Sequence, residues 1–396
     1  MASLTLAATG DILIHRPEPN SALAALEPAF ATADVTFGNF EGVLTDRHDA
    51  LPGRGSGTIA ATANASGLRA FHVLSLANNH SLDAGYGGLD DTLAALRAMG
   101  AKTVGAGRTP AEAWEPAVID VAGHTVAFVA AASVFRVGYE AKGQRGGIAA
   151  LAAVDHYAPR FPAAYVPGVP PQIISVASKD DWRRLEIAIE TARQRAEFIV
   201  VSMHWGDHTR PYVVTDFERD TAKRLSELGV DLVLGHHQHR LRGVEFYGKM
   251  PVFFGLGHVV FDLPRAVAEL RSNGADWLHL SESQLERRFG RYGHFPRPSG
   301  FMFDELARWS AIAIVELVSG AQAQVGYIPV HIDEDGTPRP VRRGSERWND
   351  FLAVMAGCIR DGYLASAVID EGRTYAGLPL LSIRSMSYDD TAACGC

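Results

Sequence analysis

Short aliphatic runs alternate with amphipathic stretches along the first 262 residues of this 396-residue chain. The runs are typical of buried strands, and apolar residues three or four positions apart in the intervening stretches are typical of helices. The expected strands are residues 4–8, 35–38, 73–77, 103–105, 117–121, 126–131, 198–203, 231–234, 244–247 and 252–254. The expected helices are residues 21–30, 87–99, 110–114, 179–197 and 216–228. This alternation predicts an α/β fold with a largely parallel sheet that is covered on its faces.

The chain changes character after residue 262. We expect residues 1–262 to form one core, and the charged segment 263–300 to be a helical and loop excursion that covers the active site. Residues 301–335 hold two amphipathic runs, which predict strands that return to the core. Residues 336–396 are expected to be a C-terminal extension with one helix and little else. The two runs are residues 311–318 and 323–331, and the helix is residues 348–359.

Glycine and proline mark the expected loops. Residues 51–57 and 138–147 are rich in glycine, which favours irregular backbone. The second of these loops opens a proline-rich passage that continues to Pro171. We expect this passage to lie over the ends of the sheet.

Five polar motifs each come directly after an apolar run. They are Gly10-Asp11, Gly38-Asn39-Phe40-Glu41, Asn78-Asn79-His80, His204-Trp205-Gly206-Asp207 and Gly235-His236-His237-Gln238-His239. In open α/β sheets the loops beyond the carboxyl ends of the strands converge, so these motifs are expected to be neighbours in space. Carboxylate, amide oxygen and neutral imidazole are the donors that bind zinc, manganese, iron or nickel. The motifs therefore predict a metal centre at one edge of the sheet.

Glu41 is the residue that we expect to bridge two cations about 3.5 to 4 Å apart. Asp11 and His15 would complete the first metal site, and Asn79, His204 and a histidine of the Gly235 motif would hold the second. A single histidine is more often structural than a ligand, so the prediction depends on the whole set. The alternative for Asn79 is a turn, because asparagine tolerates left-handed backbone.

Net charge limits the partners. A formal charge of -8 argues against a nucleic-acid partner, since phosphate-binding surfaces usually need a basic excess. A cationic or neutral substrate fits this charge, and an anionic one would need arginines placed locally. Arg145, Arg210 and Arg240 lie near motif ends and are the candidates for binding a substrate carboxylate.

No segment resembles a membrane anchor. The N-terminal residues have no basic region of a signal peptide, and no window has the roughly 20 uninterrupted apolar residues that span a bilayer. We therefore expect a cytoplasmic protein without a membrane partner. The three cysteines are Cys358, Cys394 and Cys396. The last two form a Cys-Gly-Cys tail, which we expect to carry incidental thiols and not a metal.

The order of the motifs resembles a known family. Gly-Asp, Gly-Asn-x-Glu, Ala-Asn-Asn-His, His-Trp-Gly and Gly-His-His-x-His, followed by the run from Phe254 to Asp262, resemble the CapA-like family named for poly-γ-glutamate synthesis. That family is similar to calcineurin-type metallophosphoesterases. The resemblance implies a two-layer β-sandwich flanked by helices, with a dinuclear metal centre at the strand ends. It covers residues 4–262 and, more loosely, 301–329.

The resemblance implies a set of ligands for two divalent ions, with manganese, zinc, iron, cobalt and nickel all left open. The implied ligands are Asp11, Glu41, Asn79, His204 and two of His236, His237 and His239. His80 takes the position of a second-sphere histidine that moves a proton. Three histidines depart from the family pattern. His15 stands four residues beyond Asp11. His208 stands where relatives often have an aromatic residue, and His258 stands where they often have asparagine.

The implied functions all use a peptide or phosphoester substrate. Soluble CapA-like relatives resemble metal-dependent epimerases of lasso-peptide precursors, so the leading hypothesis is epimerisation of the C-terminal residue of a peptide. His80, Asp11 and His294 are the candidate proton-transfer residues, and His208 and His258 join the arginines as substrate-binding candidates. The alternatives are hydrolysis or ligation of an amide or γ-glutamyl bond, phosphoester hydrolysis, and a non-catalytic peptide-binding module.

Overall fold

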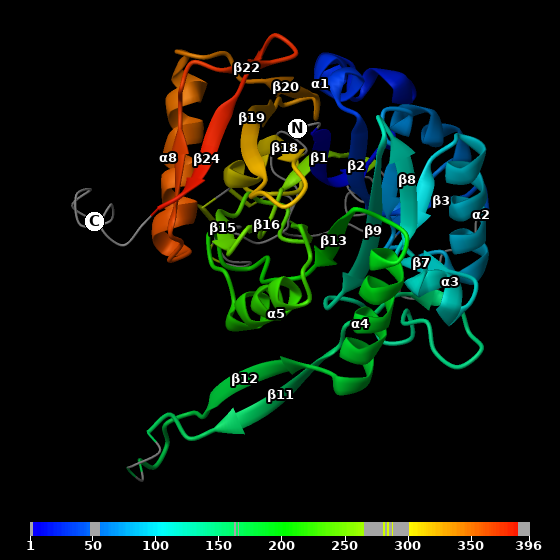
Figure 1. Ribbon diagram of the computed structural model, residues 1–396, viewed down its shortest axis with the longest axis vertical. Coiled ribbons are helices and arrows are strands. Elements are labelled where there is room, and N and C mark those ends of the chain that lie inside the picture. The colour runs from blue at the N-terminus through cyan, green and yellow to red at the C-terminus, as the bar shows by residue number, and fades with distance from the viewer. Residues whose placement is uncertain are drawn as a thin grey trace.

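The computed structural model describes residues 3–47, 56–161, 164, 166–264, 280–281, 283–284, 287 and 301–386. Within these residues the chain has a mixed α/β fold with several sheets, which confirms the expected class (Figure 1). The predicted excursion 263–300, with His294, the loop 51–57 and the tail with Cys394 and Cys396 lie largely or wholly outside the described residues. None of the described helices is both long and apolar enough to cross a membrane.

The larger sheet joins the N-terminal strands to strands from the end of the chain. Its order is β21-β24-β19-β18-β1-β2-β5-β6, with β17 beside β1 and β20 beside β19. The parallel strands are β1 (Leu4–Leu13), β2 (Val35–Phe40), β5 (Val73–Ser75), β6 (Lys102–Val104) and β17 (His258–Phe261). The antiparallel strands are β18 (Trp309–Leu317), β19 (Gln324–Ile332), β20 (Pro338–Pro340), β21 (Ser366–Ile369) and β24 (Leu381–Ser385).

A second sheet of six strands holds the middle of the chain, in the order β15-β16-β14-β13-β9-β8. Its strands are β8 (Ala117–Val121), β9 (His124–Ala132), β13 (Phe198–His204), β14 (Leu232–His236), β15 (Val244–Tyr247) and β16 (Met250–Phe253). The alternation alone predicted a single, largely parallel sheet, whereas the structure has two main sheets, as the resemblance implied. Aliphatic runs identify buried strands, but they do not say with which strand each one pairs.

The main core lies between the two sheets. Leu6 and Phe37 of the larger sheet and Phe128 and Val200 of the smaller one belong to the same buried cluster. The rings of Phe37 and Phe128 stack with centroids 5.4 Å apart. Burial of such aromatic surface is strongly favourable, so the two sheets are held face to face by this layer.

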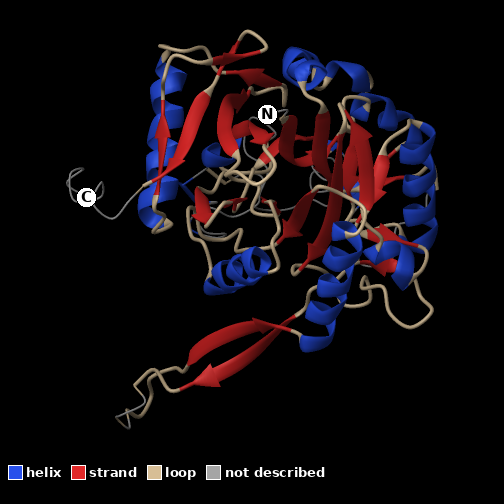
Figure 2. Cartoon of the chain, viewed as in Figure 1, coloured by secondary structure: helices blue, strands red, loops and turns tan. Residues whose placement is uncertain are grey.

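Helices cover the outer sides of the sheets (Figure 2). They are α1 (Glu27–Thr32), α2 (Gly85–Ala98), α3 (Pro110–Trp114), α4 (Lys179–Arg193), α5 (Asp216–Glu227) and α8 (Glu346–Asp361). Trp182 and Leu185 of α4 and Leu225 of α5 pack on the smaller sheet in a second buried cluster. The predicted helix 21–30 is instead two 3-10 turns followed by α1. Pro28 lacks an amide hydrogen and is accepted only in the first turn of a helix.

The end of the chain holds more structure than expected. Besides α8, it contributes β20, β21 and β24 to the larger sheet and a small pair of strands, β22 (Thr374–Tyr375) and β23 (Leu378–Pro379). Leu381 and Ile383 of β24 are buried against the core, and the pairing of β24 with β19 explains why. The expectation of one helix and little else was wrong because strands of two to five residues show too little alternation to be recognised.

The proline-rich passage also differs from the expectation. Instead of lying over the sheet ends, it contains β11 (Ala153–Ala158) and leads into β12 (Gln172–Ala177), and the two strands pair as an antiparallel hairpin. Figure 1 shows this hairpin projecting from the body beyond α4. The β-branched residues Ile173, Ile174 and Val176 of β12 favour a strand, and the prolines between the two strands confine the irregular backbone to the tip.

Candidate metal centre

The polar motifs converge where strands of both sheets end. Asp11 lies in β1 and Glu41 directly follows β2, both in the larger sheet. His204 and His236 are the last residues of β13 and β14 in the smaller sheet. These four side chains are between 0% and 1% exposed. The site therefore lies between the two sheets, at their common carboxyl edge.

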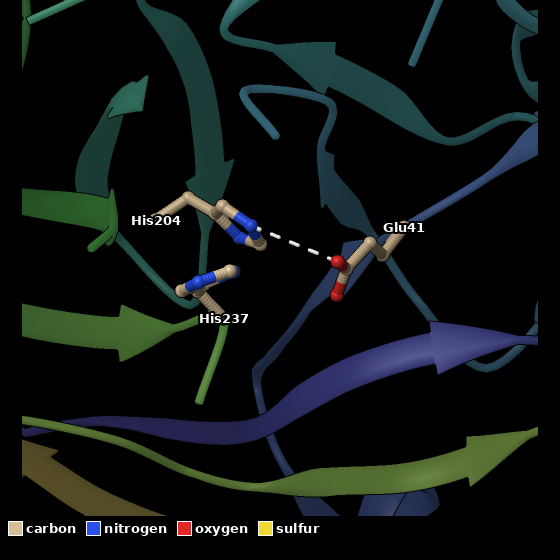
Figure 3. Close-up of side chains that lie close together, drawn as sticks. All are labelled: Glu41, His204 and His237. Carbon is tan, nitrogen blue, oxygen red and sulfur yellow. Dashed lines mark ion pairs between the residues drawn. The ribbon is translucent and has the colours of Figure 1, made fainter. Parts of the chain in front are cut away.

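Glu41 is shared by two groups of possible ligands. Glu41, His204 and His237 each place one donor atom within 4.8 Å of the others (Figure 3), and so do Asp11, Glu41 and His239. Glu41 Oε1 lies 3.7 Å from Nε2 of His204 and 3.7 Å from Nε2 of His239. A carboxylate in this position has the geometry expected of a ligand between two cations.

The carboxylate of Glu41 fits a cation on chemical grounds as well. Neither of its oxygens has a hydrogen-bond partner among the described residues, although both are buried. Burial, and then the charge of Asp11, raises the pKa of Glu41 well above its ordinary value. A buried carboxylate without donors is costly, and a divalent ion would remove this cost.

The imidazoles are held in the neutral state that binds metals. Burial lowers the pKa of His204, His237 and His239 well below the ordinary value, and neighbouring imidazoles lower it further. Burial also lowers the pKa of His236 to about 4. Neutral imidazole has a free lone pair for a cation, so this arrangement prepares the ligands for binding.

The histidine cluster of the Gly235 motif is set by unusual backbone. His237 and His239 have φ angles of 96° and 54°, a region that L residues rarely adopt. His237 donates its backbone N–H to Asp11 Oδ2 at 3.2 Å, and His239 Nδ1 lies 3.2 Å from the same oxygen. His236 belongs to neither ligand group among the described residues; its ring lies beside that of Phe37, and its Nδ1 lies 3.7 Å from Asp11 Oδ1. Such strain commonly marks functional sites.

Three asparagines orient the ligands. Asn79 Oδ1 lies 2.7 Å from His204 Nε2, so the amide oxygen faces the same space as the imidazole. Asn39 donates to Asp11 Oδ1 at 2.8 Å, and Asn78 donates to the carbonyl of Phe40 at 2.8 Å. Sequence reasoning missed Asn39 and Asn78 as orienting residues. Their position next to a predicted ligand in the same motif was the available signal.

His80 and Asp83 form a dyad at the edge of the site. His80 Nδ1 lies 2.6 Å from Asp83 Oδ2, and His80 Nε2 lies 3.9 Å from Glu41 Oε1. Burial alone would raise the pKa of Asp83, but hydrogen bonds from His80, Thr58 and Tyr139 outweigh it and lower this pKa. Asp83 was not predicted as a site residue from the sequence, although it stands only three residues after His80.

The three histidines that differ from the family pattern, His15, His208 and His258, have different surroundings. The backbone N–H of His15 donates to Asp262, and His15 belongs to neither ligand group among the described residues. The ring of His208 lies 5.1 Å from that of His237. His258 pairs with Asp11 across β17 and β1, and burial lowers its pKa to about 3. His208 and His258 thus line the site.

The three candidate arginines are not gathered at the site. Arg145 and Arg210 have side chains 50% and 61% exposed, beside Glu140 and Asp207. Arg240 is 2% exposed, and its Nε donates to Asp304 Oδ2 at 2.7 Å. The structure therefore corrects the expectation for Arg240: its guanidinium is committed to an internal carboxylate and is not available for a substrate.

Comparisons with known proteins agree with the motifs. A family model described as bacterial capsule synthesis protein PGA_cap matches residues 5–263. The PGA biosynthesis protein CapA of Bacillus subtilis is 27% identical over 275 residues, which are 65% of this chain and 63% of that protein. A probable polyglutamine synthesis accessory protein of Mycobacterium tuberculosis is 33% identical over 193 residues, which are 48% of this chain and 45% of that protein.

Solved structures align only weakly. A putative 5'-nucleotidase of Staphylococcus aureus aligns at 12% identity over 89% of this chain and 59% of its own, with a TM-score of 0.39, too low to bear on the fold. The chain thus spans less than two thirds of the length of the two curated relatives. The expected CapA-like family is nevertheless confirmed by the match to residues 5–263, and the chain belongs to the bacterial capsule synthesis protein PGA_cap family.

Proposed function

We propose that this chain is a metal-dependent enzyme of the metallophosphoesterase type that hydrolyses or ligates an amide or γ-glutamyl bond. The observation that carries the proposal is Glu41, a buried carboxylate shared by two groups of possible ligands. The names of the relatives, which concern PGA biosynthesis and polyglutamine synthesis, support an amide-linked glutamyl chain as the substrate class.

The residues present would hold two divalent ions. Asp11, Glu41 and His239 would bind one, and Glu41, Asn79, His204 and His237 would bind the other. Oxygen and nitrogen donors of this kind suit manganese, zinc, iron, cobalt or nickel. Bound divalent ions supply Lewis acidity, which polarises a carbonyl oxygen and makes its carbon open to attack.

His80 has the geometry of a proton-transfer residue. Because Asp83 accepts a hydrogen bond from Nδ1, the Nε2 atom of neutral His80 keeps its lone pair and faces Glu41. The His80 side chain is 20% exposed, so a substrate can reach it. It would take a proton from the attacking group and return it to the leaving amine.

A second candidate is epimerisation of the C-terminal residue of a peptide, such as a lasso-peptide precursor. Its support is the position of His80, whose Nε2 lies 3.9 Å from Oε1 of Glu41, beside a pair of carboxylates that could hold cations against a terminal carboxylate of a peptide. Removal and return of an α-proton need groups on opposite faces of one carbon. His80 and Asp11 would supply proton transfer, and His294, outside the described residues, was the other predicted partner.

One experiment separates the candidates. The metal-loaded protein is incubated in deuterated water with γ-linked glutamate oligomers and with linear peptides, and the products are weighed by mass spectrometry. Two fragments support amide hydrolysis, whereas uptake of one deuterium without cleavage supports epimerisation. Turnover of a phosphodiester alone, or binding without any chemical change, contradicts both. Glu41→Ala is the variant expected to be inactive. Glu316→Ala, the same substitution on β18 away from the site, is expected to keep the activity.

A further inference from the structure

The hairpin of β11 and β12 is an apolar arm. We call residues 153–177 the arm, since Figure 1 shows them extending away from both sheets. Its exposed large hydrophobic side chains are Val154, Tyr157, Phe161, Val166, Val169, Ile173, Ile174 and Val176. Each of these is at least 36% exposed, and Tyr157 is 71% exposed.

Both faces of the arm are apolar. Neighbouring residues of a strand point to opposite faces, and Ile173 and Ile174 are 57% and 42% exposed on the two sides. A two-stranded hairpin alone is marginally stable in water, and a continuous apolar surface of this kind marks an interaction site. In the body, helix α5 lies against β12.

A second apolar surface lies at the root of the arm. We call Trp114, Phe135, Val137 and Ile187 the root patch; Val137 is 94% exposed and Ile187 is 53% exposed. Two grooves of about 410 Å³ and about 300 Å³ run along it, and Trp114 lines both. Charged side chains, among them Arg184, border both grooves. Val154 of the arm lines the larger groove, so the arm and the root patch form one continuous surface.

We propose that the arm binds a second copy of this chain, with each arm lying over the root patch of the other copy. Two surfaces that adjoin on one molecule become mutually covered when two copies meet about a two-fold axis, which is the commonest symmetry of homodimers. A stable interface buries about 800 Å² and about 20 to 30 residues per partner. The described residues of the arm together with the four residues of the root patch fall within this range of residue number.

The charge of the arm favours a protein partner over a membrane or a nucleic acid. Asp155, His156 and Arg160 are its titratable acidic and basic residues in the sequence from 153 to 177, apart from tyrosines. Anionic membranes and nucleic acids are recognised by clusters of lysine and arginine, which this segment lacks. The apolar residues also run along the whole arm and not only at its tip, unlike a membrane-inserting loop.

The first test measures oligomeric state by sedimentation equilibrium of the full chain. We expect a species of twice the 42.6 kDa protomer mass. The double variant Tyr157→Ser, Ile173→Ser should raise the dimer dissociation constant by at least about 100-fold, because it removes two large apolar contacts from each arm. The control is Tyr363→Asn, which changes an aromatic residue that is 87% exposed at the end of α8 and has a φ of 50° that asparagine tolerates.

A wild-type protein that stays monomeric at its highest soluble concentration overturns the proposal, and so does a double variant that remains dimeric. Binding of the monomer to anionic vesicles that is lost in the double variant also overturns it, in favour of a membrane. None of these outcomes depends on the chemistry proposed for the metal centre.

The second test locates the contact. Two single variants, Val137→Cys and Ile173→Cys, are mixed in a background in which Cys394 and Cys396 are serine, and are treated with a short bis-maleimide. Cross-linked heterodimer should exceed that of a Val137→Cys and Tyr363→Cys mixture several-fold. Equal yields in the two mixtures would show that the arm does not reach the root patch of the other copy.

Discussion

Glu41 Oε1 lies 3.7 Å from His204 Nε2, and neither side chain is more than 1% exposed. Glu41→Gln should therefore abolish binding at both proposed metal positions, because both ligand groups contain this carboxylate. Inductively coupled plasma mass spectrometry after equilibrium dialysis measures the bound metal. Glu316→Gln on β18 is the matched control. Unchanged metal content in Glu41→Gln would refute the shared-ligand assignment.

Glu41 also predicts how stability depends on pH in the metal-free protein. Burial and Asp11 raise its folded pKa well above 4.5, so the protonated folded form is favoured. The stabilising contribution is complete below pH 4.5 and is lost as pH rises through the folded pKa. In chelator, Glu41→Gln should thus unfold at higher urea than wild type at pH 8, and the difference should shrink towards pH 4.5. A constant difference would contradict the raised pKa.

His258 gives the opposite dependence. Its folded pKa of about 3 lies below the ordinary 6.5, so the folded state resists protonation and loses stability as pH falls from 6.5 towards 3. One such group contributes a slope of up to about 1.4 kcal/mol per pH unit. Urea titrations in chelator should show a flatter profile for His258→Asn. Gln194→Asn, an exposed substitution at the end of α4 that changes no titratable group, should leave the slope unchanged.

The Arg240–Asp304 pair should be a strong structural support for the histidine motif. Asp304→Ala removes a carboxylate that accepts a hydrogen bond from the buried guanidinium of Arg240, and it should destabilise the protein by about 3–5 kcal/mol. Because Arg240 adjoins His239, metal affinity should fall as well. Chemical denaturation and metal titration measure the two effects. Asp90→Ala, which breaks an exposed pair with Arg108, is the control and should change little. Wild-type stability in Asp304→Ala would rule out this role.

His80 should affect the reaction and leave the metal in place. If it transfers a proton, His80→Ala should lower kcat by about 100- to 10,000-fold while bound metal stays constant. Asp83→Asn should give a smaller loss, since it removes the group that orients His80 Nδ1. Turnover of the substrate identified by mass spectrometry, with metal content measured in parallel, tests this. Loss of metal in His80→Ala would make it a ligand instead.

Elements that depend on a few neighbouring residues could be predicted from the sequence, and elements that depend on distant partners could not. The strand at residues 117–121 was predicted with its observed bounds, and helix 110–114 likewise, because aliphatic runs and a proline at a helix start act within a few residues. The CapA-like family was recognised from motif order, which the family match confirms. The hairpin at 153–177 and strand β24 were missed, because short strands become stable only through their pairing partners.

The sequence by itself determined which residues could carry the chemistry: carboxylates, amides and imidazoles that directly follow buried strands. Only the tertiary structure decided which of these side chains meet in one ligand group. Glu41 and His204 come from different sheets, and they meet because the sheets pack through Phe37 and Phe128. It likewise committed Arg240 to Asp304, 64 residues away in the chain. Strand pairing and the neutralisation of a buried charge depend on residues that are far apart in the sequence. Hydrophobic and polar patterns reflect only residues that are close together in it.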